Sequence, residues 1–343
     1  MTIRRLTSPC HVSAGLGVRA MVVALFACSL GLVTFSSIRA ADDEGPTYLD
    51  AVAAGKDFSI QGEYVGVLDG GQTWGAQVIA LGNGKFHCVG YPDGLPGDGY
   101  QPGTAKRESD GAWDGKVAKL QGDEFKLEIA DGKMKVVTVD GELIGTLMQV
   151  KRESPTLGQK PPQDAVVLFD GKSAEQFENG KLTEDKLLAA DCASKEKLGD
   201  HFLHIEFRTP FRPLARGQAR GNSGVYLQSR YELQVLDSFG LTGENNECGG
   251  IYSIAKPLVN MCYPPLSWQT YDIEFKAAKY DAAGKKIQNA QATIKHNGVI
   301  IHDKLDLKDG TPGRLPEGKS LEGVYLQGHG NPVVYRNIWV VKR

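Results

Sequence analysis

The sequence lacks any excess of basic residues. Its 39 Lys and Arg residues are balanced by 41 Asp and Glu residues, which gives a formal net charge of −2. Nucleic-acid-binding domains normally carry a basic patch that neutralises phosphates, so we expect no nucleic acid partner. With 41% hydrophobic and 23% charged residues, the chain has the composition of a globular protein, and its charge balance favours uncharged, polar or small-molecule ligands.

Long hydrophobic runs are also scarce. The run AMVVALFACSLGLVTF at 20–35 falls short of a comfortable transmembrane span. It follows a basic segment, 4–19, and precedes Ala40 and Ala41, which is the basic, apolar, small-residue order of a secretory signal peptide. We therefore expect 1–41 to be a signal peptide, the protein to be exported to the periplasm or the extracellular space, and the mature chain to contain no membrane span.

Cysteine is rare, with six residues and no CxxC or Cys/His spacing of the kind that binds zinc. Cys28, in LFAC, offers a lipid anchor as the alternative to signal cleavage, but the apolar run continues past it. Export would permit disulfides. Cys248 and Cys262 flank a short segment, and we expect a disulfide between them, since closing such a loop contributes roughly 3 kcal/mol. Cys88 and Cys192 fall in different parts of the chain, and the sequence leaves open whether they are free.

Helix signals are few, and a segment with three prolines, ESPTLGQKPPQD at 153–164, divides the chain. Before it, 46–152 contains one short helix candidate, TYLDAVAAG, ended by Gly55, and then seven short β-type runs separated by Gly-rich turns. After it, 165–343 contains nine β-type runs and one weak helix candidate, TEDKLLAA. We predict an all-β protein, in which a small antiparallel barrel or sandwich of unknown role precedes a two-sheet jelly-roll sandwich.

One pentapeptide, GVYLQ, occurs twice, at 224–228 and at 323–327. Two copies almost a hundred residues apart do not make a tandem repeat. They predict two strands in similar environments that lie close together in one sheet.

The run YELQVLD, at 231–237, sets polar side chains into an apolar strand. Because side chains alternate between the two faces of a strand, Glu232 and Gln234 share one face and Asp237 lies on the other. Glycoside hydrolysis by two carboxyl groups needs both within about 10 Å, and Gln234 is an amide that neither ionises nor protonates a leaving group. Hydrolysis of that kind would therefore need a carboxylate from another strand. The alternative for Glu232 and Gln234 is a solvated sheet face, while Asp237 is expected to cap a turn.

Other polar and aromatic residues are further candidates for a site. His329 lies between two glycines, which would let it approach a ligand closely. Arg336 alternates with apolar neighbours and could hold an oxyanion, or simply form an ion pair on a sheet face. The remaining candidates are amides and aromatic residues of strands and turns: Asn222, Tyr226, Tyr252, Trp268 and Gln327.

Four segments, in this order, resemble the 3-keto-disaccharide hydrolase domain family, formerly a domain of unknown function: SGVYLQSRYELQVLDSFG, GGIYSIAKPLVNMCYPPLSWQTYDIEF, IKHNGVIIHDKLDL and LQGHGNPVVYRNIWV. The resemblance covers about 165–343, with Phe177 where a tryptophan is common, and it does not extend to 46–152. It implies a concanavalin-like sandwich whose concave sheet binds saccharides. It also implies an exported bacterial protein that cleaves glycosides already oxidised to a ketone at sugar carbon 3.

A ketone at carbon 3 makes the hydrogen on carbon 2 acidic, so a single base can start the cleavage. We hypothesise that Glu232 is this base or a ligand of a divalent metal, that His329 transfers protons or is a second metal ligand, and that Arg336 stabilises the oxyanion. The expected substrate contacts are Asn222, Gln234, Tyr252, Trp268 and Gln327. The identity of any cofactor is left open. A carbohydrate-binding lectin and a conventional glucanase are the alternatives to this function.

Overall fold

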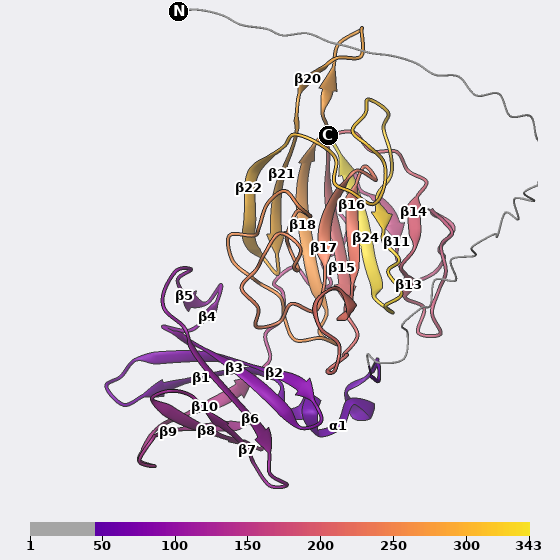
Figure 1. Ribbon diagram of the computed structural model, residues 1–343. Coiled ribbons are helices and arrows are strands. Elements are labelled where there is room, and N and C mark those ends of the chain that lie inside the picture. The colour runs from indigo at the N-terminus through magenta and orange to yellow at the C-terminus, as the bar shows by residue number, and fades with distance from the viewer. Residues whose placement is uncertain (1–44) are drawn as a thin grey trace, which may run out of the picture. The chain divides into compact units, whose positions relative to one another are not determined.

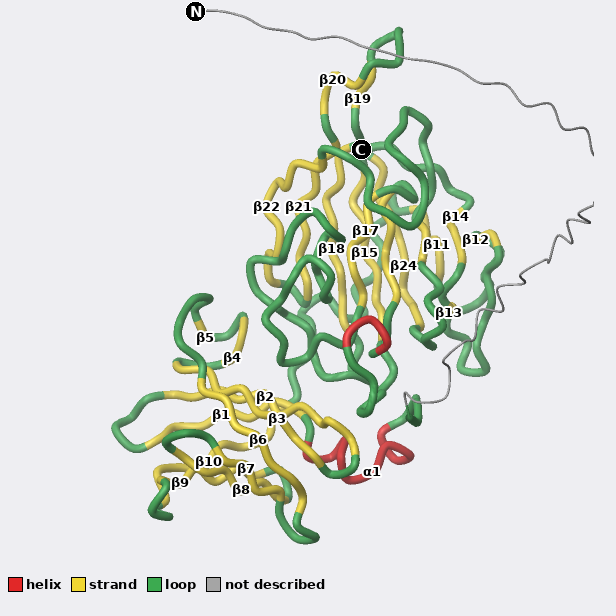
Figure 2. The backbone as a smooth tube through the Cα atoms, viewed as in Figure 1, coloured by secondary structure: helices red, strands yellow, loops and turns green. Residues whose placement is uncertain are grey.

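The computed structural model describes residues 45–343. The expected signal peptide, 1–41, and Cys28 lie outside the described residues. Strands occur throughout the described chain, whereas helix is confined to α1 (Ala51–Ile60) and the 3₁₀ turn η1 (Gly217–Ala219) (Figure 2). The predicted all-β class is therefore confirmed. No helix in residues 45–343 is long and apolar enough to cross a membrane.

The first part of the chain forms a closed antiparallel barrel of eight strands, in the order β1-β10-β9-β8-β7-β6-β3-β2 (Figure 1). Its strands are β1 (Gly62–Leu68), β2 (Thr73–Gly82), β3 (Lys85–Pro92), β6 (Arg107–Trp113), β7 (Ala118–Gln121), β8 (Phe125–Ala130), β9 (Lys133–Thr138) and β10 (Leu143–Val150). Between β3 and β6 the short strands β4 (Leu95–Pro96) and β5 (Gly99–Tyr100) form a parallel pair. Of the two architectures expected for this part, the barrel is the one observed.

Two local predictions for this part need correction. Strand β6 was not expected, because its sequence RESDGAW has no apolar alternation; the barrel interior receives only the small Ser109 and Gly111 from its middle. The helix was expected to end at Gly55, but it continues to Ile60 after a break at Gly55, where φ is +68°. Asp50 begins this helix, since its side chain accepts hydrogen bonds from the backbone nitrogens of Val52 and Ala53.

The second part is a two-sheet sandwich. One sheet has the order β11-β24-β15-β18-β21-β22, with β13 paired to β24, and we call it the first sheet. Its strands are β11 (Val166–Phe169), β13 (Leu188–Ala189), β15 (His201–Arg208), β18 (Gln269–Lys276), β21 (Ala290–His296), β22 (Val299–Leu307) and β24 (Val334–Lys342). The second sheet has the order β12-β14-β23-β16-β17. Its strands are β12 (Phe177–Glu178), β14 (Cys192–Ser194), β23 (Tyr325–Leu326), β16 (Ser223–Leu227) and β17 (Tyr231–Val235).

A short hairpin, β19 (Lys279–Tyr280) with β20 (Lys286–Gln288), extends from this part. The weak helix candidate TEDKLLAA is a turn that leads into β13, and GGIYSI forms isolated bridges rather than a strand. The two GVYLQ copies lie in β16 and β23, which pair directly through Val225 with Leu326 and Tyr226 with Tyr325. Their predicted proximity is therefore confirmed.

The core of the sandwich lies between the two sheets and follows strand alternation. In β17 the side chains of Tyr231, Leu233 and Val235 point into this core. The strand ends at Val235, so Leu236 also turns into the core instead of joining Glu232 on the outer face. Alternation therefore predicts the face of each side chain correctly within β17 and fails at Leu236, the first residue after the strand.

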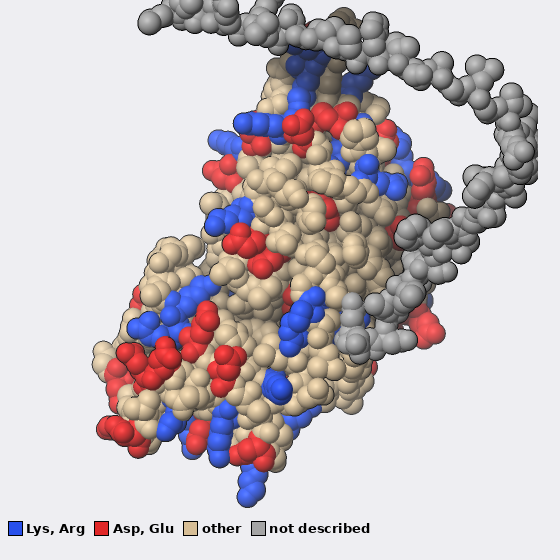
Figure 3. All heavy atoms as spheres, in the orientation of Figure 1, with Lys and Arg blue, Asp and Glu red and all other residues tan. Residues whose placement is uncertain are grey.

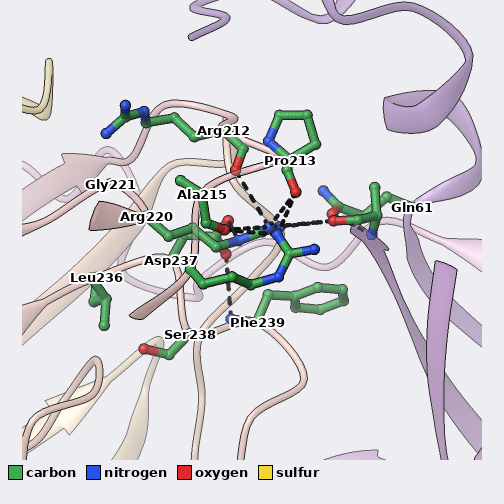
Figure 4. Close-up of polar contacts among 12 residues, drawn as sticks. Gln61, Arg212, Pro213, Ala215, Arg220, Gly221, Leu236, Asp237, Ser238 and Phe239 are labelled. Atoms are coloured by element: carbon green, nitrogen blue, oxygen red, sulfur yellow. Dashed lines mark hydrogen bonds and ion pairs between the residues drawn. The ribbon is translucent and has the colours of Figure 1, made fainter. Parts of the chain in front are cut away.

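A buried ion pair lies where the strand β17 ends (Figure 4). Arg220 donates from Nε to Asp237 Oδ2 at 2.7 Å and from Nη1 to the carbonyl oxygens of Pro213 (3.2 Å) and Ala80 (3.3 Å). Asp237 also accepts a hydrogen bond from the backbone nitrogen of Phe239 at 3.4 Å, which is the expected turn cap. Because Ala80 belongs to β2, this ion pair connects a loop of the sandwich to the barrel.

Charged residues of both signs are mixed over the face shown in Figure 3, with no patch of one sign. This distribution agrees with the net charge of −2 and offers no basic surface to a nucleic acid on that face.

Candidate functional site

Glu232 lies on the outer face of the second sheet, on the edge strand β17. Its face was predicted from alternation, but its environment was not. Only 3% of Glu232 and 1% of Gln234 are exposed, so these residues are not on a solvated sheet face. The chain keeps a carboxyl group and an amide buried side by side, which is costly unless both are hydrogen bonded.

Hydrogen bonds from neighbouring strands hold the Glu232 carboxyl group. Tyr226 is its cross-strand partner on β16, and the Tyr226 hydroxyl donates to Glu232 Oε2 at 2.7 Å. Gln327 Nε2 donates in turn to the Tyr226 hydroxyl at 3.2 Å. With the Gln234 amide turned toward the carboxyl group, its nitrogen donates to Glu232 Oε1 (3.0 Å) and to the carbonyl oxygen of Ser223 (2.8 Å). Both carboxyl oxygens therefore have a fixed donor.

Two glycines make room for this arrangement. A Cβ at Gly224, on the neighbouring strand, would lie 2.5 Å from Glu232 Oε1. At Gly313, where φ is +100°, a Cβ would lie 2.6 Å from the Tyr226 hydroxyl. The segment around Gly313 is tied to the strand, because the Glu232 backbone nitrogen donates to Thr311 Oγ1 at 2.9 Å. The loop after β22 thus covers the carboxyl group and shields it from water.

Burial raises the pKa of Glu232 to about 7, although the hydrogen bond from Tyr226 acts in the opposite direction. No Lys, Arg or His forms an ion pair with Glu232 in residues 45–343. Burial also raises the pKa of Tyr226, and the neighbouring Glu232 raises it further, so Tyr226 stays a neutral donor. Glu232 is therefore poised to exchange a proton close to neutral pH, as a general base must.

Several predicted substrate contacts lie around Glu232. Asn222 donates from Nδ2 to Gln218 Oε1 at 3.0 Å, while its own side-chain oxygen is buried without a partner. The side-chain oxygen of Gln327 is likewise buried without a partner. Tyr252 is half-buried, its backbone nitrogen donates to the Glu232 carbonyl oxygen at 3.1 Å, and its phenol is near enough to raise the pKa of Tyr226. The unpaired Gln327 oxygen belongs to the amide that contacts Tyr226, and the unpaired Asn222 oxygen belongs to the amide network that reaches Glu232 through Gln218 and Gln234; both oxygens are acceptors that sugar hydroxyls could satisfy.

Arg336 and Trp268 do not belong to this site, which corrects the prediction. Arg336 is on β24 of the first sheet; its neighbour Tyr335 points into the core, so Arg336 points away from the second sheet. Its Nε donates to Glu206 Oε2 at 2.7 Å, and its guanidinium stacks 4.0 Å from the centroid of the Trp268 ring. Arg336 and Glu232 lie on the outer faces of opposite sheets. The whole thickness of the sandwich core therefore separates them.

The role of Arg336 on that face is explained by Glu206, which is fully buried. Burial acts to raise the pKa of Glu206, but hydrogen bonds from His204, Asn337 and Arg336 outweigh it and lower the pKa to about 2. The segment 153–164 also contributes, since Gly158 donates its backbone N–H to Glu206 Oε1 at 2.6 Å. Arg336 thus forms an ion pair with Glu206 on the face of the first sheet. This is the structural role that the sequence offered as the alternative to stabilising an oxyanion.

His329 lies on the exposed loop after β23. Its carbonyl oxygen accepts a hydrogen bond from Asn331 Nδ2 at 3.1 Å, and no hydrogen bond or ion pair joins its imidazole to Glu232 among the described residues. No group of three or more His, Cys, Asp or Glu side chains is placed to hold a metal ion in residues 45–343. Glu232 is thus buried on β17 while His329 lies on an exposed loop, and no contact between their side chains brings them together in the described part of the chain.

Cys248 and Cys262 are free thiols in the structure, and the predicted disulfide between them is not formed. Cys248 Sγ lies 3.3 Å from the Tyr271 hydroxyl, and Cys262 Sγ donates to the carbonyl oxygen of Leu236 at 3.5 Å. Both thiols are buried and have hydrogen-bond partners, so each is accommodated without a bridge. Cys88 and Cys192, whose state the sequence left open, are also free.

The family of the protein can be identified from the sequence of the sandwich. A family model described as the 3-keto-alpha-glucoside-1,2-lyase-like domain matches residues 164–341, more than half of the chain. The chain belongs to this family. The resemblance noted from four sequence segments is thereby confirmed, and the sandwich is a carbohydrate-acting domain that we call the lyase-like domain.

Three solved structures from Parabacteroides distasonis ATCC 8503, each described as a "putative glycosyl hydrolase", are similar to the chain. One is 32% identical, with 53% of this chain and 85% of that protein covered and a TM-score of 0.48. A second is 15% identical, with 53% and 94% covered and a TM-score of 0.39. A third is 21% identical, with 52% and 99% covered and a TM-score of 0.35. A comparison with curated proteins gives no match.

The surroundings of Glu232 limit the chemistry of the lyase-like domain. Burial and Tyr226 account for the pKa of Glu232, and no other carboxyl group in residues 45–343 contributes. A retaining or inverting glycosidase works with a pair of carboxyl groups on either side of the bond that is cleaved. The side chains that are hydrogen bonded to Glu232 are a phenol and an amide, and a carboxyl group held in this way is suited to removing a single proton.

The sequence did not reveal the partnership of Tyr226 with Glu232 and offered Tyr226 only as one of several aromatic candidates for a site. The signal is the three-residue turn 228–230 between the strands, in which Gln228 (φ +48°) and Ser229 (φ +52°) have positive φ. Such turns normally contain Asn or Gly, which adopt positive φ easily. Because neither is present, the hairpin that places Tyr226 opposite Glu232 was not apparent.

Proposed function

We propose that the lyase-like domain cleaves 3-keto-glycosides by elimination, with Glu232 as the general base. The observation that carries this proposal is a buried carboxyl group of raised pKa, whose hydrogen-bond donors are the phenol of Tyr226 and the amide of Gln234. The family description supports the same substrate class. Export of the protein is part of the proposal, because residues 1–41 have the order of a signal peptide.

The proposed reaction begins when the Glu232 carboxylate takes the proton from carbon 2. The electron pair left on carbon 2 is delocalised into the carbon 3 ketone as an enolate, which hydrogen-bond donors stabilise. The enolate then re-forms the ketone, a double bond forms between carbons 1 and 2, and the bond from carbon 1 to the leaving oxygen breaks. The leaving oxygen takes up a proton, and water can add to the double bond to give the free 3-keto sugar.

In this proposal, amides replace Arg336 as the groups that stabilise the oxyanion. Gln327 donates to the Tyr226 hydroxyl, Asn222 donates to Gln218 next to Gln234, and each of the two amides has a buried oxygen without a partner. In the proposal their nitrogens face the enolate oxygen and their oxygens accept sugar hydroxyls. Tyr226 keeps the carboxylate oriented through its hydroxyl.

The decisive experiment compares a 3-keto-disaccharide with the unoxidised disaccharide in D₂O. We expect only the 3-keto substrate to release monosaccharide. The 3-keto sugar formed by addition of D₂O to the double bond should carry deuterium at carbon 2, because that carbon is deprotonated and then takes up deuterium. Mass spectrometry and NMR of the products measure both results. Cleavage of the unoxidised sugar would support a conventional glucanase, and saturable binding without any product would support a lectin; either outcome overturns the proposal.

The pH profile gives an independent test. We expect kcat/KM to rise with pH and to level off above about pH 7, since only the deprotonated Glu232 acts as a base. The Tyr226 hydrogen bond lowers the pKa of Glu232, so Tyr226→Phe should move the midpoint to higher pH. A profile without an inflection between pH 5 and 9, or a midpoint that Tyr226→Phe lowers, would contradict the assignment of the base.

A further inference from the structure

The barrel contains a cavity that the chemistry of the lyase-like domain does not use. It has a volume of about 210 Å³ and is lined by residues of seven of the eight barrel strands. Its inner wall is apolar and buried, as at Ala76, Cys88, Met134 and Leu147. Burial raises the pKa of the Cys88 thiol to about 12, so the wall carries no charge. Closed eight-stranded barrels are just wide enough to hold one small ligand.

The mouth of this cavity differs from its wall. Four half-buried apolar side chains surround it: Leu68, Trp74, Phe125 and Ile144. Two of them are aromatic, so an aromatic ring could pack against them in stacked or edge-to-face geometry. The Trp74 indole is fixed by a hydrogen bond from Nε1 to Gln72 Oε1 at 3.2 Å.

The apolar wall excludes a sugar as the ligand. Each hydroxyl of a sugar would lose its hydrogen bonds to water without a replacement, at a cost of roughly 1–3 kcal/mol. An apolar cavity of about 150 Å³ is known to bind benzene, so the cavity here, at about 210 Å³, suits a single aromatic ring with a small substituent. The ligand class therefore differs from the substrate class of the sandwich.

Two charged residues at the edge of the cavity specify the substituent. Arg107 and Glu124 both line it and both are exposed. Neither forms an ion pair with any residue in the described part of the chain. A guanidinium donates hydrogen bonds and a carboxylate accepts them. A hydroxyl group, which does both, matches this pair better than an anion or a cation, because either ion would be repelled by one of the two residues.

We propose that the barrel binds a small phenol in this cavity. The ring lies between the apolar wall and the aromatic mouth, and the hydroxyl lies at the edge beside Arg107 and Glu124. This is a binding site in the barrel itself, and it does not depend on the reaction proposed for the lyase-like domain.

The test is calorimetric titration of the full-length mature protein with phenol, benzoate and glucose, followed by the paired variants Trp74→Leu and Trp113→Leu. We expect phenol to bind with a Kd below about 1 mM, and benzoate at least about tenfold more weakly. Trp74→Leu should weaken phenol binding by about tenfold or more. Trp113→Leu is the matched control: Trp113 belongs to the same barrel but does not line the cavity, and Lys56 Nζ lies 4.7 Å from its ring centroid, so binding should be unchanged.

A cavity-filling variant, Ala76→Leu, adds a second arm. We expect this variant to abolish phenol binding. Circular dichroism shows whether it folds, and if it does not, the comparison of the two tryptophan variants alone tests the proposal. No saturable phenol binding up to about 10 mM, equal binding of benzoate, or equal effects of the two tryptophan variants would overturn the proposal. Glucose binding that Trp74→Leu abolishes would also overturn the proposal, because it would place a sugar in the cavity. Glucose binding that Trp74→Leu leaves unchanged takes place outside the cavity and agrees with the proposal.

Discussion

Glu232→Gln is expected to lower kcat on a 3-keto-disaccharide by about 10²–10⁴-fold, the usual contribution of a general base. Glutamine preserves the size of the side chain and can still accept from Tyr226, which donates to Glu232 Oε2. It cannot take a proton from carbon 2. The loss should therefore appear in kcat more than in KM, because substrate contacts such as Asn222 and Gln327 remain.

The same variant should be more stable than the wild type at pH 8. The pKa of Glu232 is about 7 in the folded protein, against 4.5 for an unperturbed glutamate. A raised pKa means that the folded state favours the protonated form, so stability is fully present below pH 4.5 and is lost as pH rises toward 7. The ionised carboxyl group then costs on the order of 3 kcal/mol, from the pKa difference alone. Urea unfolding should show Glu232→Gln to be more stable than the wild type at pH 8, and close to it at pH 4.

Glu274→Gln provides the matched control. Glu274 is an exposed glutamate on β18 of the first sheet, and we expect its replacement to change neither activity nor stability. Glu232→Gln activity within about threefold of the wild type would remove Glu232 from the mechanism. An unchanged stability at pH 8 would show that the carboxyl group is not buried in the charged form.

The faces of Tyr231 to Val235 followed from alternation, because that rule depends only on the extended backbone, and the rule ended with the strand before Leu236. What alternation does not give is the environment of the face. Glu232 is buried because a loop eighty residues further along the chain, around Thr311 and Gly313, folds over it. The pKa of Glu232, and with it the proposed chemistry, depends on that distant loop.

Arg336 shows the complementary limit. Its sequence neighbourhood, VVYRNIW, correctly indicated a strand, and it lies in the same C-terminal segment as Gln327. The chain crosses from the second sheet to the first between Gln327 and Arg336. The two residues are close in sequence and were therefore assigned to one site, but they lie on opposite sheets. Only the pairing of β24 with β15, which sequence patterns do not reveal, separates them.

Arg220→Met is expected to be the most destabilising single replacement outside the core, at a cost of about 3–5 kcal/mol. It removes the guanidinium from the buried Asp237, of which only 2% is exposed. Burial raises the pKa of Asp237 even with Arg220 present, so an unpaired carboxylate there would be strongly disfavoured. Because a raised pKa favours the folded state at low pH, the deficit should shrink as pH falls from 8 to 4.

The double variant Arg220→Met/Asp237→Leu isolates the cause. It removes both charges and leaves apolar side chains in their place, and such replacements of buried ion pairs are often nearly neutral. We therefore expect it to regain most of the stability that Arg220→Met loses, measured by urea unfolding at pH 8. Arg216→Met is the control, since Arg216 donates to the carbonyl oxygens of Pro213 and Leu81 but to no carboxylate in the described chain, and its loss should cost about 1 kcal/mol. If the double variant were as unstable as Arg220→Met, the hydrogen bonds of Arg220 to carbonyl oxygens such as that of Ala80, rather than its charge, would hold the loop of the sandwich against β2.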